Sequence, residues 1–120
     1  MKIAIVGSRT FTDYKLLSDT IYNWITTTPE TSKSTTEIVS GGARGADTLA
    51  ERFAKEFDLR LKIFRAEWGK YGKYAGYKRN ILIVDYSDVI FAFWDGQSKG
   101  TMHDINIARK KDKELHIIKF

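Results

Sequence analysis

The sequence predicts an α/β fold with a mainly parallel, doubly wound five-stranded sheet and helices on both faces. Short apolar runs alternate with helical patterns along the whole chain, and these runs lack a strict polar–apolar alternation. Continuous apolar runs suit parallel strands that are buried on both faces. Regular alternation of strand and helix implies parallel strands joined by right-handed crossovers. At 120 residues, the chain is expected to form one domain, residues 1–120, with a sizeable core.

The first half of the chain supplies two strands and one helix before its most informative turn. Within residues 1–40 the expected strands are Lys2–Val6 and Glu37–Ser40. A helix lies between them and ends before Pro29, because apolar residues recur at helical spacing, namely Leu17, Ile21, Trp24 and Ile25. Thr26–Thr36 is rich in Thr and Ser and holds the only proline, so we expect a loop there.

The second half continues the alternation with three strands and three helices. The strands are Leu59–Phe64, Asp88–Trp94 and Leu115–Lys119. The clearest helix keeps the i, i+3, i+4, i+7 spacing without a break, through Ala46, Leu49, Ala50, Phe53, Ala54 and Phe57. The other two helices are expected at about Lys73–Tyr86 and about Thr101–Lys111.

The helix at Lys73–Tyr86 is unusual, because Ile81–Val84 is apolar on every side of a helix. One side can cover the sheet, and an exposed apolar strip on the other side usually marks a partner surface. We therefore expect a homodimer or higher oligomer through this helix, since closed twofold pairs are the commonest oligomers. The alternative is that another helix of the same chain covers the strip.

Composition describes an ordinary soluble globular protein, with 29% charged and 42% hydrophobic residues. Cysteine is absent, which excludes disulfides and thiolate metal sites. No apolar run approaches membrane-spanning length and no signal peptide is visible, so we expect a cytoplasmic protein without a membrane partner. A net charge of +5 favours anionic partners but is too small and too dispersed to require nucleic acid.

The glycine-rich turn Ser40–Asp47 joins an apolar strand to the clearest helix. Bare N–H groups and the helix dipole at such a turn attract an anion, most often a phosphate. Glycines let a ligand approach the backbone, and Arg44 can add a charge-assisted contact. Asp47 would either balance the dipole or bind a ribose hydroxyl. The alternative is a plain strand-to-helix turn that needs glycine for its dihedral angles.

The loops that follow the other strands carry matching chemistry. Ligands of open parallel sheets bind outside the carboxyl ends of the strands, where the strand order reverses. These loops hold nearly all the glycines and many basic residues, whereas the opposite ends carry no such cluster. The expected ligand-binding residues are Gly7, Ser8, Arg9, Ser40, Gly41, Gly42, Arg44, Gly45, Asp47, Trp68, Arg79, Asp95, Gly96, Lys99, Gly100 and Thr101.

Each of these residue types can make a different contact with a phosphorylated ligand. Glycines permit close approach, hydroxyls donate to phosphate oxygens, and the basic side chains supply charge. Trp68 or Trp94 would stack on a base, or would pack in the core beside the loops.

Other chemistries find no support in the sequence. No Walker pattern is present, because Ala46-Asp47 follows Gly45 in place of Lys-Ser/Thr. His103 and His116 lack metal-ligand spacing, and no nucleophile elbow occurs. We therefore expect no metal and no cofactor.

The same motifs, taken in order, resemble the YspA-type branch of the SLOG superfamily, the Rossmann-like group named after the Smf/DprA and LOG proteins. The matching residues are Gly7-Ser8-Arg9, Ser40 through Asp47, Trp68, Gly72-Lys73, Ala75-Gly76, Arg79-Asn80, Phe93 through Gly96 and Gly100-Thr101. They cover almost the whole chain. The resemblance implies a Rossmann-like domain that binds nucleotides or nucleotide-derived ligands, adds Asn80 to the expected site, and suggests a bacterial or phage protein.

Two relatives in the superfamily imply different activities. LOG phosphoribohydrolases cleave the N-glycosidic bond of nucleoside monophosphates with an Arg, which Arg79 matches, and a Glu, whose place Asp104 takes. Asp104 is one methylene shorter than Glu, the Pro-Gly-Gly of that motif is missing, and we expect Asp104 in the first turn of its helix, balancing the dipole. DprA proteins share the Ser-Gly-Gly-Ala-x-Gly turn and bind single-stranded DNA.

These comparisons order the functional hypotheses. The expected function is a sensor or sequestering protein for a nucleotide-derived signal. The alternatives are an N-glycosidase that uses Arg79 and Asp104 as catalytic residues, and a DprA-like nucleic-acid binder.

Overall fold

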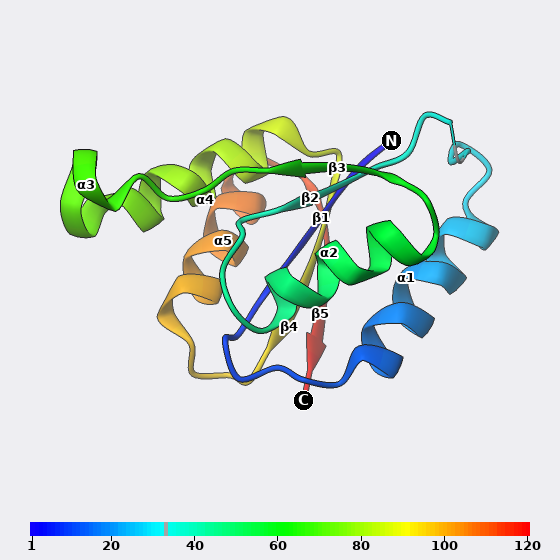
Figure 1. The fold of residues 1–120 in the computed structure, drawn as a ribbon, viewed down its shortest axis with the longest axis horizontal. Coiled ribbons are helices and arrows are strands. Elements are labelled where there is room, and N and C mark those ends of the chain that lie inside the picture. The colour runs from blue at the N-terminus through cyan, green and yellow to red at the C-terminus, as the bar shows by residue number, and fades with distance from the viewer. Residues whose placement is uncertain (33) are drawn as a thin grey trace.

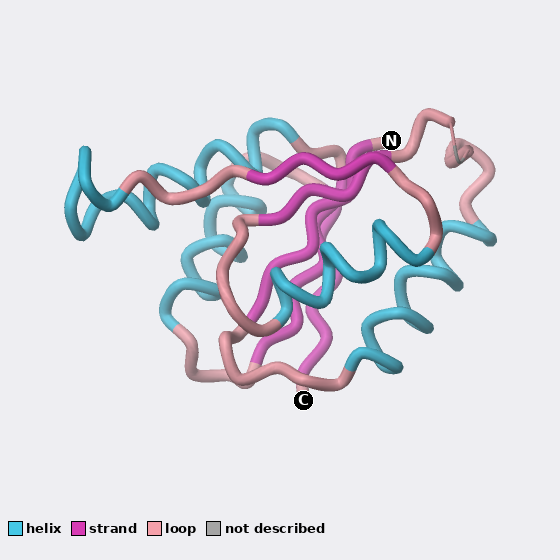
Figure 2. The backbone as a smooth tube through the Cα atoms, viewed as in Figure 1, coloured by secondary structure: helices cyan, strands magenta, loops and turns pink. Residues whose placement is uncertain are grey.

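A computed structural model describes residues 1–32 and 34–120 and contains one five-stranded sheet in which every paired strand is parallel. The strand order is β3-β2-β1-β4-β5, so the first strand of the chain lies at the centre (Figures 1 and 2). The strands are β1 (Lys2–Gly7), β2 (Glu37–Ser40), β3 (Arg60–Ile63), β4 (Val89–Trp94) and β5 (Glu114–Lys119). The predicted doubly wound, Rossmann-like α/β fold is confirmed.

The helices form a layer on each face of the sheet (Figure 1). One layer contains α1 (Tyr14–Thr27) and α2 (Ala46–Glu56), and the other contains α4 (Ala75–Tyr86) and α5 (Lys99–Lys110). The short helix α3 (Trp68–Tyr71) and the 3-10 turn η1 (Gly72–Tyr74) precede α4. The longest described helix has 14 residues, and none of the described helices is long and apolar enough to cross a membrane.

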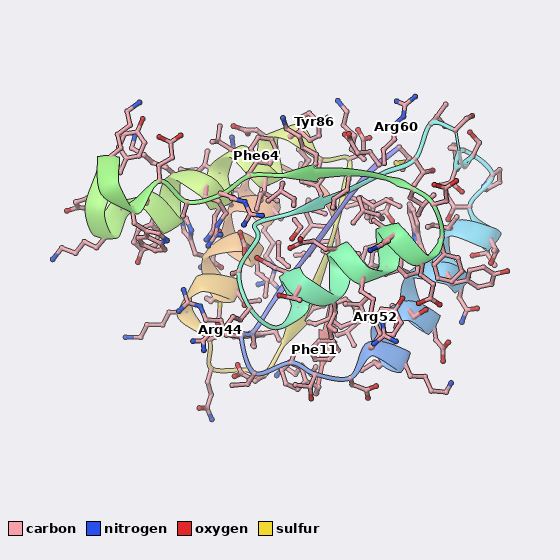
Figure 3. The ribbon with its side chains drawn as sticks, viewed as in Figure 1. Phe11, Arg44, Arg52, Arg60, Phe64 and Tyr86 are labelled. Atoms are coloured by element: carbon pink, nitrogen blue, oxygen red, sulfur yellow. The ribbon has the colours of Figure 1, made fainter. Side chains whose placement is uncertain are left out.

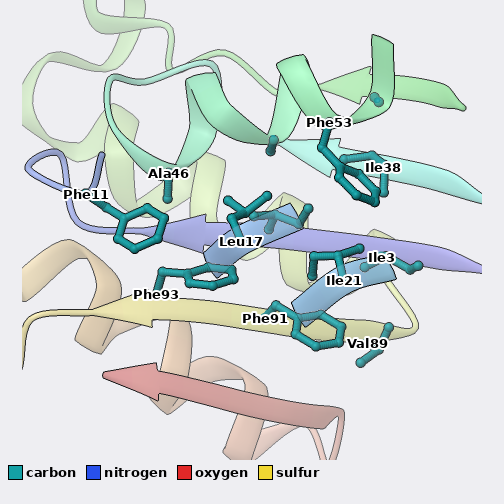
Figure 4. Packing of buried hydrophobic residues seen from close by; sticks show 13 residues of the cluster. Ile3, Phe11, Leu17, Ile21, Ile38, Ala46, Phe53, Val89, Phe91 and Phe93 are labelled. Carbon is teal, nitrogen blue, oxygen red and sulfur yellow. The ribbon is translucent and has the colours of Figure 1, made fainter. Parts of the chain in front are cut away.

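Both faces of the central strands are apolar, which explains the missing polar–apolar alternation. On β1, Ile3 and Ile5 pack under α1 and α2, whereas Ala4 and Val6 pack under α4 and α5. The first core is rich in aromatic rings, and the centroids of Phe11 and Phe93 lie 4.9 Å apart (Figure 4). The edge strand β3 is different, because three of its four residues are exposed.

Local hydrogen bonds set the helix ends. Asp13 caps α1 by accepting from the Leu16 N–H at 3.0 Å, and Ser98 caps α5 by accepting from the Thr101 N–H at 3.4 Å. The loop predicted at Thr26–Thr36 begins later than expected, because α1 continues through Thr27 before Pro29. Lys33 within that predicted loop lies outside the described residues.

The apolar run Ile81–Val84 of the third predicted helix lies partly in the core and partly at the surface. That helix, expected from Lys73, begins at Ala75, and the preceding segment expected as a loop contains α3 and η1. Ile83 and Val84 are buried in the core against β1 and β4. Ile81 and Leu82 remain 40% and 53% exposed, so part of the run lies at the surface.

The chain reverses its direction of winding at the centre of the sheet. The segment after β1 leads to α1 on one face, whereas the segment after β4 leads to α5 on the other. The segments that follow these two paired strands therefore leave towards opposite faces of the sheet, and a crevice lies between them. Gly7 ends β1 at this point, where a Cβ atom would lie 2.4 Å from the Phe93 carbonyl oxygen and 2.8 Å from Ala46 Cβ.

The substitution Gly7→Ala is expected to lower the free energy of unfolding by at least about 2 kcal/mol, because the added methyl has no room between β4 and α2. The matched control is Gly69→Ala, where a Cβ meets no atom within 4 Å and the change should stay within about 0.5 kcal/mol. Urea denaturation of both variants tests this packing. Equal stability of the two variants would contradict it.

Candidate ligand-binding crevice

The crevice at the carboxyl edge of the sheet contains two adjacent cavities. The inner cavity, of about 360 Å³, lies between the loops that follow β1 and β4. It is lined by Val6, Gly7, Ser8, Arg9, Thr10, Ala43, Asp47, Arg79, Asn80, Ile83, Asp95, Ser98, Gly100, Thr101 and Asp104. Residues far apart in the sequence therefore meet where the strand order reverses, which is where ligands of such sheets bind.

The outer cavity, of about 370 Å³, lies over the glycine-rich turn after β2. Its lining residues are Arg9, Gly41, Gly42, Ala43, Arg44, Arg65, Ala66, Trp68 and Arg79. Arg9, Ala43 and Arg79 line both cavities, so the two cavities adjoin at these residues. A smaller recess of about 180 Å³ adjoins them beside Trp68, Lys73 and Tyr77.

The glycine-rich turn is stabilised from within. The Ser40 hydroxyl donates to the Asp47 carbonyl oxygen at 3.1 Å and accepts from the Gly42 N–H at 3.2 Å. The Ala43 N–H donates to Asp47 Oδ2 at 3.2 Å. Two amides that were expected to face a phosphate therefore have partners inside the protein, and charge for an anion must come mainly from side chains.

Backbone geometry gives the turn a requirement for glycine that is independent of any ligand. Gly45 has a φ of 75°, and a Cβ atom there would lie 2.3 Å from the Ser8 carbonyl oxygen. The same oxygen accepts from the Ala46 N–H at 3.4 Å. This contact holds the start of α2 against the loop after β1. The need for glycine at Gly45 therefore fits the alternative of a plain strand-to-helix turn.

Arg79 lies at the junction of the two cavities and connects three parts of the chain. Its Nη1 donates to the Gly41 carbonyl oxygen at 2.8 Å, and its Nε donates to Asn80 Oδ1 at 3.0 Å. The Asn80 amide in turn contacts the Gly100 carbonyl oxygen at 3.4 Å and His103 Nδ1 at 3.1 Å. Arg79 is thus half-buried and held in place, with unused donors that face both cavities.

The position of Asp104 in its helix differs from the predicted position. It was expected in the first turn of its helix, but α5 begins at Lys99, so Asp104 is the sixth residue and lies in the second turn. Its side chain is buried, with the residue only 5% exposed, and Oδ1 has no hydrogen-bond partner among the described residues. A role in balancing the helix dipole is therefore wrong. Asp104 lines the inner cavity, and its buried Oδ1 is an unsatisfied acceptor.

A second carboxyl group lies in the same cavity. Burial raises the pKa of Asp47 to about 6, although the Ala43 N–H and the charge of Arg79 oppose this shift. Burial also raises the pKa of Asp104 well above its ordinary value, and the nearby negative charge of Asp47 raises it further. The inner cavity therefore holds carboxyl groups that keep a proton to unusually high pH.

Further predicted residues shape the loop after β4. Asp95 Oδ1 accepts from the N–H groups of Gln97 and Ser98, both at 2.8 Å, and these bonds lower the pKa of Asp95. The Ser8 hydroxyl oxygen accepts from the Asp95 N–H at 3.3 Å, which ties this loop to the loop after β1.

Several predicted residues line neither cavity, namely Ser40, Gly45, Gly96 and Lys99. Trp94 packs beside its loop and donates its indole N–H to the Ser98 carbonyl oxygen at 3.1 Å, whereas Trp68 is 52% exposed in the outer cavity. Arg65 was not among the predicted residues, although it directly follows the predicted strand Leu59–Phe64 and so lies at the same edge of the sheet.

Two comparisons based on sequence agree with this architecture. The model of the YspA, cpYpsA-related SLOG family matches residues 1–71. The chain is 36% identical over 115 residues to the Gene 61 protein of Mycobacterium phage D29, which covers 91% of this chain and 89% of that protein.

Two solved structures share the fold. DNA processing protein A from Helicobacter pylori, described with a single-stranded DNA binding mode, matches 98% of this chain with a TM-score of 0.73 and 23% identity. DNA processing protein A (DprA) from Streptococcus pneumoniae matches 97% of this chain with a TM-score of 0.75 and 17% identity. The chain spans 64% and 49% of the lengths of those two proteins, respectively.

The raised pKa of Asp47 predicts a pH-dependent stability. The folded protein keeps this proton up to about pH 6, whereas the unfolded chain loses it near the ordinary value of 3.8, so the free energy of unfolding should fall as pH rises between these values. The fall attributable to Asp47 is at most about 3 kcal/mol. Asp47→Asn should remove it, because Asn cannot ionise but keeps an oxygen for the Ala43 N–H.

Urea denaturation at several pH values between 4 and 7 measures this difference. Asp19→Asn, a change in an exposed pair with Lys15, should keep the pH dependence of the parent protein. A profile of Asp47→Asn that runs parallel to the parent profile would show that Asp47 titrates normally in the folded state.

Proposed function

The chain belongs to the YspA, cpYpsA-related SLOG family, and from that premise we propose that its crevice binds a nucleotide or a nucleotide-derived signalling ligand. The observation that carries this proposal is the buried, unpaired Asp104 oxygen in a cavity that Arg79 also lines. A ribose hydroxyl or a base amino group satisfies such an acceptor, while a guanidinium pairs with phosphate.

The two kinds of ligand group fit different walls of the crevice. Phosphate fits beside Arg9 and Arg79, which line both cavities and carry positive charge. The N–H groups of Gly42 and Ala43 are already bonded within the turn and are not free to bind the phosphate. The nucleoside fits the inner cavity, where Asp104 Oδ1 has no partner among the described residues. A volume of about 360 Å³ suits a small ligand of this kind.

A sensor or sequestering protein requires only this binding, in a single nucleotide-binding domain of residues 1–120. The similarity to a protein of a mycobacterial phage supports a role in phages or their hosts. DprA-like binding of single-stranded nucleic acid is an alternative with its own support. Trp68 and Tyr77 are each more than half exposed and line the recess beside the crevice, and exposed aromatic rings beside arginines can stack on bases.

A panel of ligands separates these two proposals. A nucleotide at 100 times its Kd should stabilise the fold by about 2.7 kcal/mol, which raises the Tm by roughly 10 °C. Arg79→Ala should abolish this rise, and Lys78→Ala, at an exposed neighbour on the same helix, should keep it. Thermal melting with mono-, di- and cyclic nucleotides and with single-stranded DNA is the measurement. A response to DNA alone that weakens steeply with salt would favour the DprA-like alternative.

A second candidate function, N-glycosidic cleavage of nucleoside monophosphates, is favoured by one observation. Asp104 and Arg79 line the same cavity, and Asp104 Oδ1 has no hydrogen-bond partner among the residues that the structure describes. A carboxylate can stabilise positive charge at the anomeric carbon, but burial raises the pKa of Asp104 and so opposes its ionised form. Binding without turnover therefore remains the first proposal.

Chromatographic detection of free base during long incubation with each nucleoside monophosphate distinguishes binding without turnover from N-glycosidic cleavage. We expect little or no release of base by the parent protein. We also expect Asp104→Asn to alter ligand affinity, because it changes the acceptor in the inner cavity. Multiple turnovers by the parent protein that vanish in Asp104→Asn would establish the glycosidase instead.

Self-association through α4 is a further part of the proposal. Leu82 is 53% exposed and Ile81 40% exposed, so an aspartate at Leu82 should dissociate a dimer without entering the core. Val84 is fully buried within the chain and is unsuitable for this test. Light scattering should show a dimer for the parent protein and a monomer for Leu82→Asp. A monomeric parent protein at high concentration would end this proposal.

A further inference from the structure

The two cavities differ sharply in charge. Three aspartates line the inner cavity, namely Asp47, Asp95 and Asp104. Four arginines line the outer cavity and no acidic residue does, within the part of the chain that the structure describes. The arginines are Arg9, Arg44, Arg65 and Arg79, and they come from the loop after β1, the glycine-rich turn, the segment after β3 and helix α4.

None of these four guanidinium groups forms a close ion pair among the described residues, although Arg79 is near enough to Asp47 and Asp104 for its charge to act on them. Arg79 donates only to uncharged oxygens, those of Gly41 and Asn80. Arg9, Arg44 and Arg65 are exposed and can meet a ligand from solvent. A cavity lined by convergent, unpaired arginines is suited to several phosphate oxygens, because each planar group can bind two of them.

The glycine-rich turn makes room for two of these side chains. A Cβ on Gly41 would lie 2.7 Å from Arg79 Nη1, and a Cβ on Gly42 would lie 2.8 Å from Arg65 Nη1. The two guanidinium groups thus rest against consecutive residues of the same turn. Because Arg79 also lines the inner cavity, a ligand bound there can extend past it into the outer cavity.

We propose that the outer cavity is a second anion subsite, so that the ligand of this crevice is a nucleoside joined to at least two phosphoryl groups. The first phosphoryl group lies at Arg9 and Arg79, and the second at Arg44 and Arg65. The nucleoside part of this inference rests on the proposed function. A single phosphate leaves the second pair of arginines without an anion, whereas a diphosphate reaches both.

Two kinds of compound carry such a diphosphate group: a nucleoside diphosphate, and two nucleosides joined by a diphosphate. Trp68 lies in the outer cavity and is 52% exposed, so its ring is available to stack on a second base. A change in the affinity of the two-nucleoside compound on Trp68→Ala would identify that source, and no change would identify the nucleoside diphosphate.

Isothermal titration calorimetry with nucleoside mono- and diphosphates of each base, dinucleoside diphosphates and inorganic pyrophosphate tests the subsite. We expect a diphosphate to bind at least tenfold more tightly than the monophosphate of the same nucleoside. Arg65→Gln should remove this advantage and leave monophosphate affinity within twofold. Arg60→Gln is the matched control, since Arg60 begins β3, the strand that precedes Arg65, and lies at the other end of the sheet from Arg44 (Figure 3).

The outcomes separate this inference from the proposed function. Equal affinity for mono- and diphosphates, or an equal loss of both in Arg65→Gln, would overturn the second subsite while nucleotide binding stands. Binding of pyrophosphate that depends on Arg65, without binding of any nucleotide, would support the anion subsite and overturn the proposed function. No binding of any of these compounds to the parent protein would overturn both. Thermal melting of each variant shows whether it is folded.

Discussion

Parallel pairing of β1 with both β2 and β4 is the constraint on which the rest of this structure depends. It places the carboxyl ends of three strands side by side, and the change of face between α1 and α5 opens the crevice there. The close approach at Gly7 shows how tightly this point is packed, because β1, β4 and α2 leave no space for a methyl group. The loops after β1, β2 and β4, which carry much of the candidate site, all begin at this junction.

The crevice separates its charges by depth. Carboxyl groups at Asp47 and Asp104 are buried, which disfavours their ionised forms, whereas most of the arginines lie at the exposed mouth. Arg79 lies between them and is held by Gly41 and Asn80. This arrangement suits a ligand with hydrogen-bond donors at one end and phosphate at the other. Such a ligand would satisfy the Asp104 oxygen that the protein itself leaves unpaired.

The sequence predicts the fold well because its signals are local. Continuous apolar runs and helical spacing identify all five strands and the main helices, and strand–helix alternation identifies the parallel sheet. Contacts between distant residues are less predictable. The burial of Asp104 follows from the start of α5 at Lys99 after the Ser98 cap, and from the packing of α5 on the sheet, neither of which periodicity reveals. The internal bonding of the Ala43 amide depends on the orientation of Asp47, which spacing alone does not determine.

The central claim is that this crevice binds a nucleotide-derived small molecule. Mass spectrometry of compounds released by denaturing the protein, purified without added nucleotide, tests this claim most directly when Arg79→Ala is purified in parallel. We expect the parent protein to release a phosphorylated compound that contains a base, and the variant to release less of it. Release of oligonucleotides alone, or of the same small molecules in equal amounts from both proteins, would contradict the claim.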